Sequence, residues 1–333
     1  MQIPLSSWSS LVELPHRPLG GGLINDTFSV GSPPVAVVQR LHTIFDPILH
    51  EDIEAITAHI ANKGLVTPRL LRTDDGALWT LDGEERCWRA LSWVPGVSVE
   101  RLDSAQRART AGDLVGRWHR ATEDLQHTFA FTRSGAHDTD QHMTTLVRAL
   151  DRHTGHRLRD EVGPLADQIL TGWAAWDGRL EGPTRIAHGD LKISNLRFDD
   201  QGGGICLLDL DTMAALSMDI EMGDALRSWC NPAGEDVEEA SFDSALFEAA
   251  MGGWLAVNPQ PEEERTAIVH GVERICLELA SRFAADALNE SYFGWNPEMC
   301  VSRGAHNLLR ARGQASLARS VQEQSSALHA MIR

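Results

Sequence analysis

The spacing of apolar residues changes character near residue 95. Before that point, apolar residues come in short β-branched runs, such as 35–38 (VAVV), which is followed by the polar pair Gln39-Arg40. Residues 78–81 and 87–94 flank an Asp-Gly turn, a pattern that is typical of a β-hairpin. This part of the chain therefore predicts a small sheet.

Apolar residues at intervals of three and four predict helices, of which the first lies before residue 95. The predicted helices cover 48–62, 105–125, a segment from about 140, 165–180, 242–255, 262–290 and 306–328. Pro95-Gly96 separates the two kinds of pattern. We therefore expect an α+β fold of two lobes, a small β-rich N-terminal lobe over 1–95 and a larger, mainly helical C-terminal lobe over 96–333.

Composition narrows the functional classes. The chain has 333 residues, enough for two lobes with hydrophobic cores. Its formal net charge of −17 disfavours nucleic acid and anionic membrane surfaces as partners. The five cysteines are scattered without a CxxC pair, as expected for reduced thiols in a cytoplasmic protein. We find no signal-peptide pattern, and no run of about eighteen apolar residues that would span a membrane.

The densest group of chemically active residues lies in 186–211, IAHGDLKISNLRFDDQGGGICLLDLD. Phosphoryl transfer from ATP needs a carboxylate to orient the acceptor hydroxyl, a divalent cation on the phosphates and positive charge beside the transferred group. Asp190 is the candidate carboxylate and Lys192 the candidate charge. Asn195 and Asp209 offer oxygen ligands of the kind that Mg²⁺ prefers. The stretch predicts a small-molecule kinase that uses ATP and Mg²⁺.

Asp209 and Asp211 stand at the end of an apolar run, 205–208. On a strand, residues two apart share a face, so the two carboxylates would repel each other unless a cation lay between them. We expect Asp209 to bind the metal, whereas Asp211 is a candidate for the metal, for the substrate, or for a place beside them. His188 is expected to be structural, because phosphoryl transfer requires no histidine base.

The order of these motifs resembles the aminoglycoside phosphotransferase/choline kinase superfamily, whose two lobes are similar to those of a protein kinase. Within it, the chain is most similar to the N-acetylhexosamine 1-kinase group. The stretches that carry the resemblance are 22–28 (GLINDTF), 38–42 (VQRLH), 137–139 (HDT), 208–212 (LDLDT), 282–286 (RFAAD) and 307–312 (NLLRAR). Two residues depart from that group, since Gly189 and Ser194 stand where it usually has asparagine.

The resemblance implies that the N-terminal lobe binds ATP. The backbone of Gly20, Gly21 and Gly22 would approach the phosphates, with Asn25 close by. Three glycines before a strand are, taken alone, more often a plain hairpin turn. By its order along the chain, the backbone over Ala90–Trp93 would meet the adenine.

A protein kinase carries a lysine on the strand that follows the glycine-rich turn, and this chain has none there. Gln39 or Arg40 takes its place, and strand alternation allows only one of them to point inward. Glu51 or Glu54 of the following helix is the candidate partner.

The resemblance also implies that His137, Asp138, Arg282 and Asp286 lie near the acceptor. Each has a plainer interpretation, because Asp138 or Thr139 suits a helix N-cap, and residues 282 and 286 are spaced as a surface pair.

Asp224, by the same resemblance, would brace the catalytic loop through hydrogen bonds. We therefore expect an ATP-dependent kinase that phosphorylates a sugar hydroxyl, with the anomeric position of an N-acetylhexosamine or related hexose as the first candidate. An aminoglycoside or a choline-like amino alcohol is the alternative acceptor, which the acidic net charge permits. A non-catalytic nucleotide-binding pseudokinase is a further alternative, to which the absent lysine points.

Overall fold

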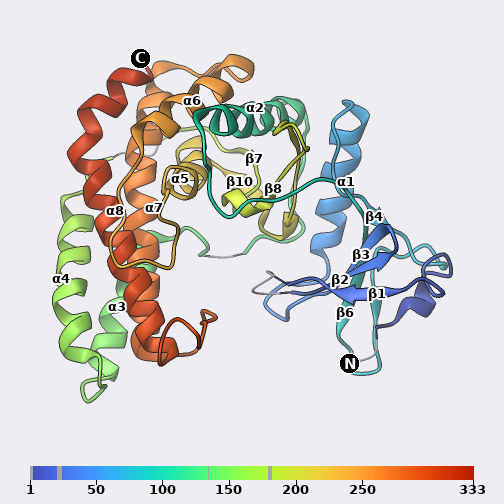
Figure 1. Ribbon diagram of the computed structural model, residues 1–333, viewed down its shortest axis with the longest axis horizontal. Helices are drawn as coiled ribbons and strands as arrows, with labels where there is room; N and C mark the ends of the chain where they lie inside the picture. The colour runs from blue at the N-terminus through green and yellow to red at the C-terminus, as the bar shows by residue number, and fades with distance from the viewer. Residues whose placement is uncertain (1–2, 21–24, 134, 179–181) are drawn as a thin grey trace.

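The chain folds into a β-sheet part followed by a mainly helical part (Figure 1). The structure, a computed structural model, describes residues 3–20, 25–133, 135–178 and 182–333. The arrangement is the α+β fold predicted from the sequence, with a β-rich N-terminal lobe and a larger helical C-terminal lobe. Among the described residues, no helix combines the length and the apolar character needed to cross a bilayer.

The N-terminal sheet is antiparallel, and its strands run in the order β1-β2-β3-β6-β4, with β5 paired to β6. The strands are β1 (His16–Pro18), β2 (Asp26–Gly31), β3 (Pro34–Arg40), β4 (Leu70–Leu71), β5 (Thr80–Leu81) and β6 (Cys87–Ser92). Helix α1 (Leu49–Asn62) follows β3 and buries Ile53, Ile56 and Ile60 in the main core, as their spacing predicted.

The two faces of this sheet have different surroundings. On one face, Val38 and Ala90 pack with Trp8 in a small separate core. The register of β3 and β6 places Gln39 opposite Arg89, so these two polar side chains share the other face. Alternation along β3 then turns Arg40 away from Gln39. The sheet thus presents one apolar face and one face that carries charge.

Helix α7 organises the C-terminal lobe and packs against α3, α4, α5 and α8. Figure 1 shows α4, α7 and α8 running alongside one another. The helices are α2 (Ala105–Thr122), α3 (Thr139–Arg152), α4 (Arg159–Ala175), α5 (Met218–Trp229), α6 (Ser244–Val257), α7 (Glu262–Asn289) and α8 (Arg303–Met331).

Helices α5 and α7 touch at a pair of glycines. A Cβ added to Gly223 would lie 2.7 Å from the Gly271 carbonyl carbon, and one added to Gly271 would lie 2.1 Å from the Asp219 carbonyl oxygen. Only glycine allows the two backbones to approach this closely. The crossing fixes α5, whose buried acidic residues lie beside the central stretch 186–211.

The central stretch itself is short and irregular. It runs through β7 (Arg185–Ala187), the 3-10 turn η2 (Ile193–Asn195), β8 (Leu196–Phe198) and β9 (Gly204–Leu207). The 3-10 turn η3 (Leu210–Thr212) and β10 (Ala214–Leu216) follow, and β10 pairs with β7. The two ends of the central stretch are therefore side by side, joined by the pairing of β7 with β10.

Candidate active site

Asp190, Lys192 and Asn195 form one hydrogen-bonded unit after β7. Lys192 Nζ donates to Asp190 Oδ2 at 2.8 Å, and Asn195 Nδ2 donates to the same oxygen at 3.1 Å. Burial acts to raise the pKa of Asp190, but the charge and hydrogen bond of Lys192 outweigh it, so the pKa of this carboxyl lies below its usual range. Asp190 is therefore ionised at neutral pH. Because Asp190 holds the amide nitrogen of Asn195, the amide oxygen is left to face a ligand.

Gly189 and His188 shape the backbone before Asp190. Gly189 has φ +76°, and an added Cβ would lie 2.3 Å from the Thr212 carbonyl oxygen. Glycine is therefore required by both conformation and space. The His188 ring donates from Nε2 to the Leu208 carbonyl at 2.8 Å, and its Nδ1 accepts the Asp190 backbone N–H at 3.3 Å. His188 holds the two halves of the stretch together, in line with the structural role expected for it.

Glu221 of α5 braces this backbone from beneath. Its carboxylate accepts the backbone N–H groups of His188 at 2.8 Å and Gly189 at 2.9 Å. It also accepts a hydrogen bond from His119 Nε2, while His119 Nδ1 accepts from the Trp254 indole N–H. An indole N–H only donates, so His119 is fixed as the neutral tautomer with its proton on Nε2.

The bracing role implied for Asp224 thus belongs to Glu221, one helical turn earlier. Asp224 Oδ1 instead accepts from Arg227 at 3.0 Å, and its buried Oδ2 has no hydrogen-bond partner among the described residues. Burial and the nearby Asp190 charge raise the pKa of Asp224 in spite of Arg227. Asp224 lies close enough to both Asp190 and His137 to feel their charges.

Asp209 lies in a bend and not on a strand, which corrects the prediction for this pair of carboxylates. Strand β9 ends at Leu207, Asp209 adopts the left-handed conformation (φ 60°, ψ 63°), and Asp211 follows within η3. Asp209 retains solvent exposure, yet the surrounding protein partly strips its hydration and, with the Asp211 charge, raises its pKa to about 6. A divalent cation beside Asp209 would relieve this cost.

Asp211 is the counter-ion of Arg89 on β6. Both side chains are almost fully buried, at 1% and 2% exposure, and Arg89 donates to both carboxylate oxygens. Asn25 Nδ2 also donates to Asp211 Oδ2 at 2.7 Å. Burial acts to raise the pKa of Asp211, but Arg89 outweighs it and holds the pKa below its usual range. With both oxygens engaged, Asp211 ties the N-terminal sheet to the site and is not an open metal or substrate ligand.

Arg89 was not among the predicted site residues, and Gln39 orients it. Gln39 Oε1 accepts from Arg89 Nε at 2.9 Å, and Gln39 Nε2 donates to Thr27 Oγ1 at 3.1 Å. Gln39 therefore faces the site, whereas Arg40, the last residue of β3, pairs with Asp26, the first residue of β2. The only sequence signal for Arg89 was its place on a strand that could pair with the one carrying Gln39.

The helix partner expected from α1 for Gln39 or Arg40 is not found: among the described residues, neither Glu51 nor Glu54 bonds to Gln39, Arg40 or Arg89. Glu54 forms ion pairs with Arg69 and Arg72, and Glu51 is exposed. Asp211 supplies the acidic partner instead.

The other nucleotide-side candidates are placed as follows. Gly20 is exposed, and Gly21 and Gly22 lie outside the described residues. Ala90 is inside the sheet, since β6 pairs there with both β3 and β4. The Trp93 N–H donates to the Val35 carbonyl at 3.1 Å, so it is not free to bind an adenine edge.

The acceptor-side candidates divide between structural roles and a cavity. Asp138 caps α3 by accepting the Gln141 N–H at 3.0 Å. Asp286 accepts backbone N–H groups from 291–293 and the Asn307 amide, so it holds a loop and does not face a ligand. His137 is hydrogen-bonded to Glu278.

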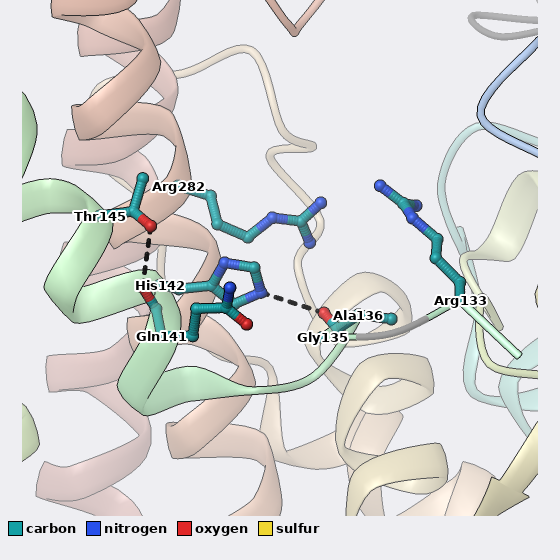
Figure 2. A pocket seen from close by; sticks show the side chains of 7 residues that line it. All are labelled: Arg133, Gly135, Ala136, Gln141, His142, Thr145 and Arg282. Atoms are coloured by element: carbon teal, nitrogen blue, oxygen red, sulfur yellow. Dashed lines mark hydrogen bonds between the residues drawn. The ribbon is translucent and has the colours of Figure 1, made fainter.

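Arg282 reaches the cavity, which measures about 210 Å³ (Figure 2). Its lining residues are Arg133, Gly135, Ala136, Gln141, His142, Thr145 and Arg282.

Comparisons with known proteins give the family and the fold of the chain. Residues 15–259 match the model of the phosphotransferase enzyme family, a span that includes the whole central stretch and α5. An aminoglycoside phosphotransferase from Alicyclobacillus acidocaldarius subsp. acidocaldarius is 16% identical, with a TM-score of 0.58 over 97% of this chain and 95% of that one. A choline/ethanolamine kinase family protein from Mesorhizobium loti is 16% identical, with a TM-score of 0.59 over 98% and 94%.

A third solved structure, the amicoumacin kinase hAmiN in complex with AMP-PNP, Ca²⁺ and Ami, is 12% identical, with a TM-score of 0.62 over 93% of this chain and 88% of that one. At these identities the likeness establishes a shared fold. The family match covers more than half of the chain and contains the unit of Asp190, Lys192 and Asn195. The chain belongs to the phosphotransferase enzyme family.

Proposed function

We propose that this phosphotransferase moves the γ-phosphoryl group of ATP to a hydroxyl of a sugar. The hydrogen-bonded unit of Asp190, Lys192 and Asn195 carries the proposal. Asp190, ionised and half-buried, accepts the proton of the attacking hydroxyl. As the oxygen–phosphorus bond to the acceptor forms, the bond to the ADP oxygen breaks. Lys192 offsets the charge on the transferred group.

The residues present fit Mg²⁺ held jointly with the nucleotide. Asn195 Oδ1 and the Asp209 carboxylate are the oxygen ligands that we assign to it. Among the described residues, no group of three or more His, Cys, Asp or Glu side chains is gathered to hold a metal by itself. Mg²⁺ commonly completes its shell with phosphate oxygens and water, and when bound it neutralises charge that develops on the phosphates.

A sugar, with the anomeric hydroxyl of an N-acetylhexosamine or related hexose as first candidate, is the acceptor we favour. The similarity to the N-acetylhexosamine 1-kinase group supports it. A choline-like amino alcohol is the second candidate, supported by the acidic net charge.

Release of ADP in the presence of Mg²⁺ and a panel of hexoses, N-acetylhexosamines and amino alcohols tests the function. We expect turnover with at least one sugar, and phosphorus NMR of the product identifies the hydroxyl. Turnover with amino alcohols alone would reject the sugar, and no ATP turnover with any acceptor would favour a pseudokinase.

Asp190→Asn should lower turnover roughly 10²–10⁴-fold, because it removes the proton acceptor. Asp200→Asn is the matched control, since Asp200 is exposed on the nearby β8–β9 turn and loses the same charge. The melting temperature of both variants checks the fold. Near-full activity of Asp190→Asn with an intact fold would contradict the assigned role.

A further inference from the structure

We propose that Arg133 and Arg282 bind an oxyanion carried by the acceptor, namely a carboxylate, sulfate or phosphate group. The inference rests on the proposed kinase function for its link to turnover, whereas anion binding is measurable without it. In Figure 2 the two guanidinium groups point toward the same space above Gly135 and Ala136. Arg133 comes from the loop between α2 and α3, and Arg282 from α7.

Neither arginine has an acidic partner within ion-pair distance among the described residues. This contrasts with Arg185 and Arg310, which pair with Glu264 and Asp236. The chain carries 47 acidic residues against 30 lysines and arginines, so potential partners are abundant. Two guanidinium groups left without a carboxylate at one cavity are therefore suited to an anion from outside.

An aromatic pair holds both arginines in place. Arg133 donates to the Tyr292 hydroxyl and lies over its ring at 5.9 Å, while Arg282 lies over the Phe293 ring at 5.5 Å. The two rings meet edge to face at 4.8 Å. Asp286 accepts the backbone N–H groups of both aromatic residues. The guanidinium groups are thus pre-positioned, which lowers the ordering cost of binding.

Among the described residues, the other polar groups around the cavity form no ion pair with the two arginines. Glu278 is the nearby acid, and its charge acts on Arg282 without an ion-pair contact. Its oxygens accept hydrogen bonds from His137 and Thr139. Burial, aided by the Arg282 charge, lowers the pKa of His142, so this ring is neutral at pH 7. The positive charge at the cavity therefore comes from the two arginines.

As part of this proposal, we place the cavity on the acceptor side of Asp190. Ala136 lines the cavity, and the adjacent His137 is hydrogen-bonded to Glu278, about one turn before Arg282 on α7. His137 feels the charges of both Arg282 and Asp224, and Asp224 in turn feels that of Asp190. Arg282, His137 and Asp224 are thus neighbouring charged groups between the cavity and Asp190, the proposed proton acceptor. An acceptor whose hydroxyl reaches Asp190 could therefore place a second, anionic substituent between the arginines.

Calorimetric titration with sodium sulfate tests the site directly. Saturating ADP and Mg²⁺ keep sulfate out of the nucleotide site, and sodium chloride at equal ionic strength is the blank. We expect the double variant Arg133→Gln/Arg282→Gln to bind sulfate at least about tenfold more weakly than the wild type. Arg319→Gln, which removes one exposed charge on α8, should bind like the wild type. Absence of sulfate binding to the wild type, or unchanged binding by the double variant, would overturn the proposal.

Matched sugar pairs identify the anionic group. Galactose is compared with galacturonate, and N-acetylglucosamine with its 6-sulfate and its 6-phosphate. We expect kcat/KM for one anionic member to exceed that of its neutral partner by about tenfold or more, and Arg282→Gln should raise the KM for that acceptor while leaving the KM for ATP unchanged. Arg282→Lys, which keeps the charge, should recover part of the loss.

The outcomes separate this inference from the proposed function. Equal kcat/KM for neutral and charged sugars would reject the anion site and leave the sugar kinase intact. A change in the KM for ATP alone would assign the arginines to the nucleotide. If no acceptor is phosphorylated, the proposed function fails, and the sulfate titration still decides whether the site binds anions.

Discussion

Arg89 and Arg282 occupy opposite environments in the same molecule. Arg89 is buried, and its guanidinium is satisfied by Asp211 and Gln39. Arg282 rests on an aromatic ring at the edge of a cavity, with no acidic partner among the described residues. Breaking a buried ion pair lowers the stability of the fold. An unpaired charge that is already held in position contributes instead to the affinity for a ligand. The two arginines should therefore respond to mutation in different measurements.

The largest effect is expected from Arg89→Met. It leaves the Asp211 carboxylate buried without its cation, so the free energy of unfolding should fall by about 3–5 kcal/mol. Arg282→Met should lower it by about 1 kcal/mol or less, since only a contact with an aromatic ring is lost. Urea unfolding measures both.

The double variant Arg89→Met/Asp211→Leu sharpens this contrast. It removes both charges, and it should therefore be more stable than Arg89→Met alone. If Arg89→Met and Arg282→Met lowered the free energy of unfolding equally, the proposed difference between the two arginines would be wrong.

A smaller effect is expected from Glu221→Gln, in which one carboxylate oxygen becomes an NH₂ group, so that the backbone N–H of either His188 or Gly189 loses its acceptor. Stability should fall by about 1–3 kcal/mol, and turnover should fall roughly tenfold because the backbone before Asp190 loses its brace. The readout that distinguishes positioning from stability alone is kcat measured well below the melting temperature. The KM for ATP should stay unchanged. Glu239→Gln, which changes an exposed acid between α5 and α6 that has no ion pair among the described residues, is the control.

The smallest effect concerns pH and His137. Burial acts to lower the pKa of His137, but the hydrogen bond and charge of Glu278, with the Asp224 charge, outweigh it and raise the pKa above 6.5 in spite of Arg282. A raised folded-state pKa contributes stability that is complete below about pH 6.5 and is lost as pH rises through the folded pKa.

His137→Gln should therefore remove about 1 kcal/mol or less at pH 6 and nothing at high pH. Urea midpoints from pH 6 to 9 test this. Parallel pH profiles for the variant and the wild type would show that His137 makes no such contribution.

The sequence predicted those features that depend on neighbouring residues. The unit of Asp190, Lys192 and Asn195 was found because its members lie within six consecutive residues. A cap at Asp138 or Thr139 was among the interpretations because capping is local, and Asp138 is the residue that caps α3. The division into a sheet and a helical lobe followed from periodicity alone.

Features that depend on pairing between distant segments could not be predicted. Arg89 meets Asp211 across 122 positions, and that contact is set by the register of β3 and β6. Glu221 and Asp224 are nearly one turn apart on α5, so both face the same side, and only the crossing at Gly223 and Gly271 decides which of them reaches the backbone. The bend at Asp209 could not be predicted from the sequence either, because a run of apolar residues does not indicate the residue at which a strand ends.

Because α5 and α7 cross at glycines, α7 also fixes the distance between the two ends of the proposed acceptor site. Helix α5 is held at Gly271 and carries the brace beneath Asp190, while Arg282 stands eleven positions further along the same rigid helix, a rise of roughly 16 Å. Both reference points of the proposed acceptor site thus belong to one lobe, and relative motion of the two lobes leaves their spacing unchanged. Selection by acceptor length would then be independent of whether nucleotide is bound.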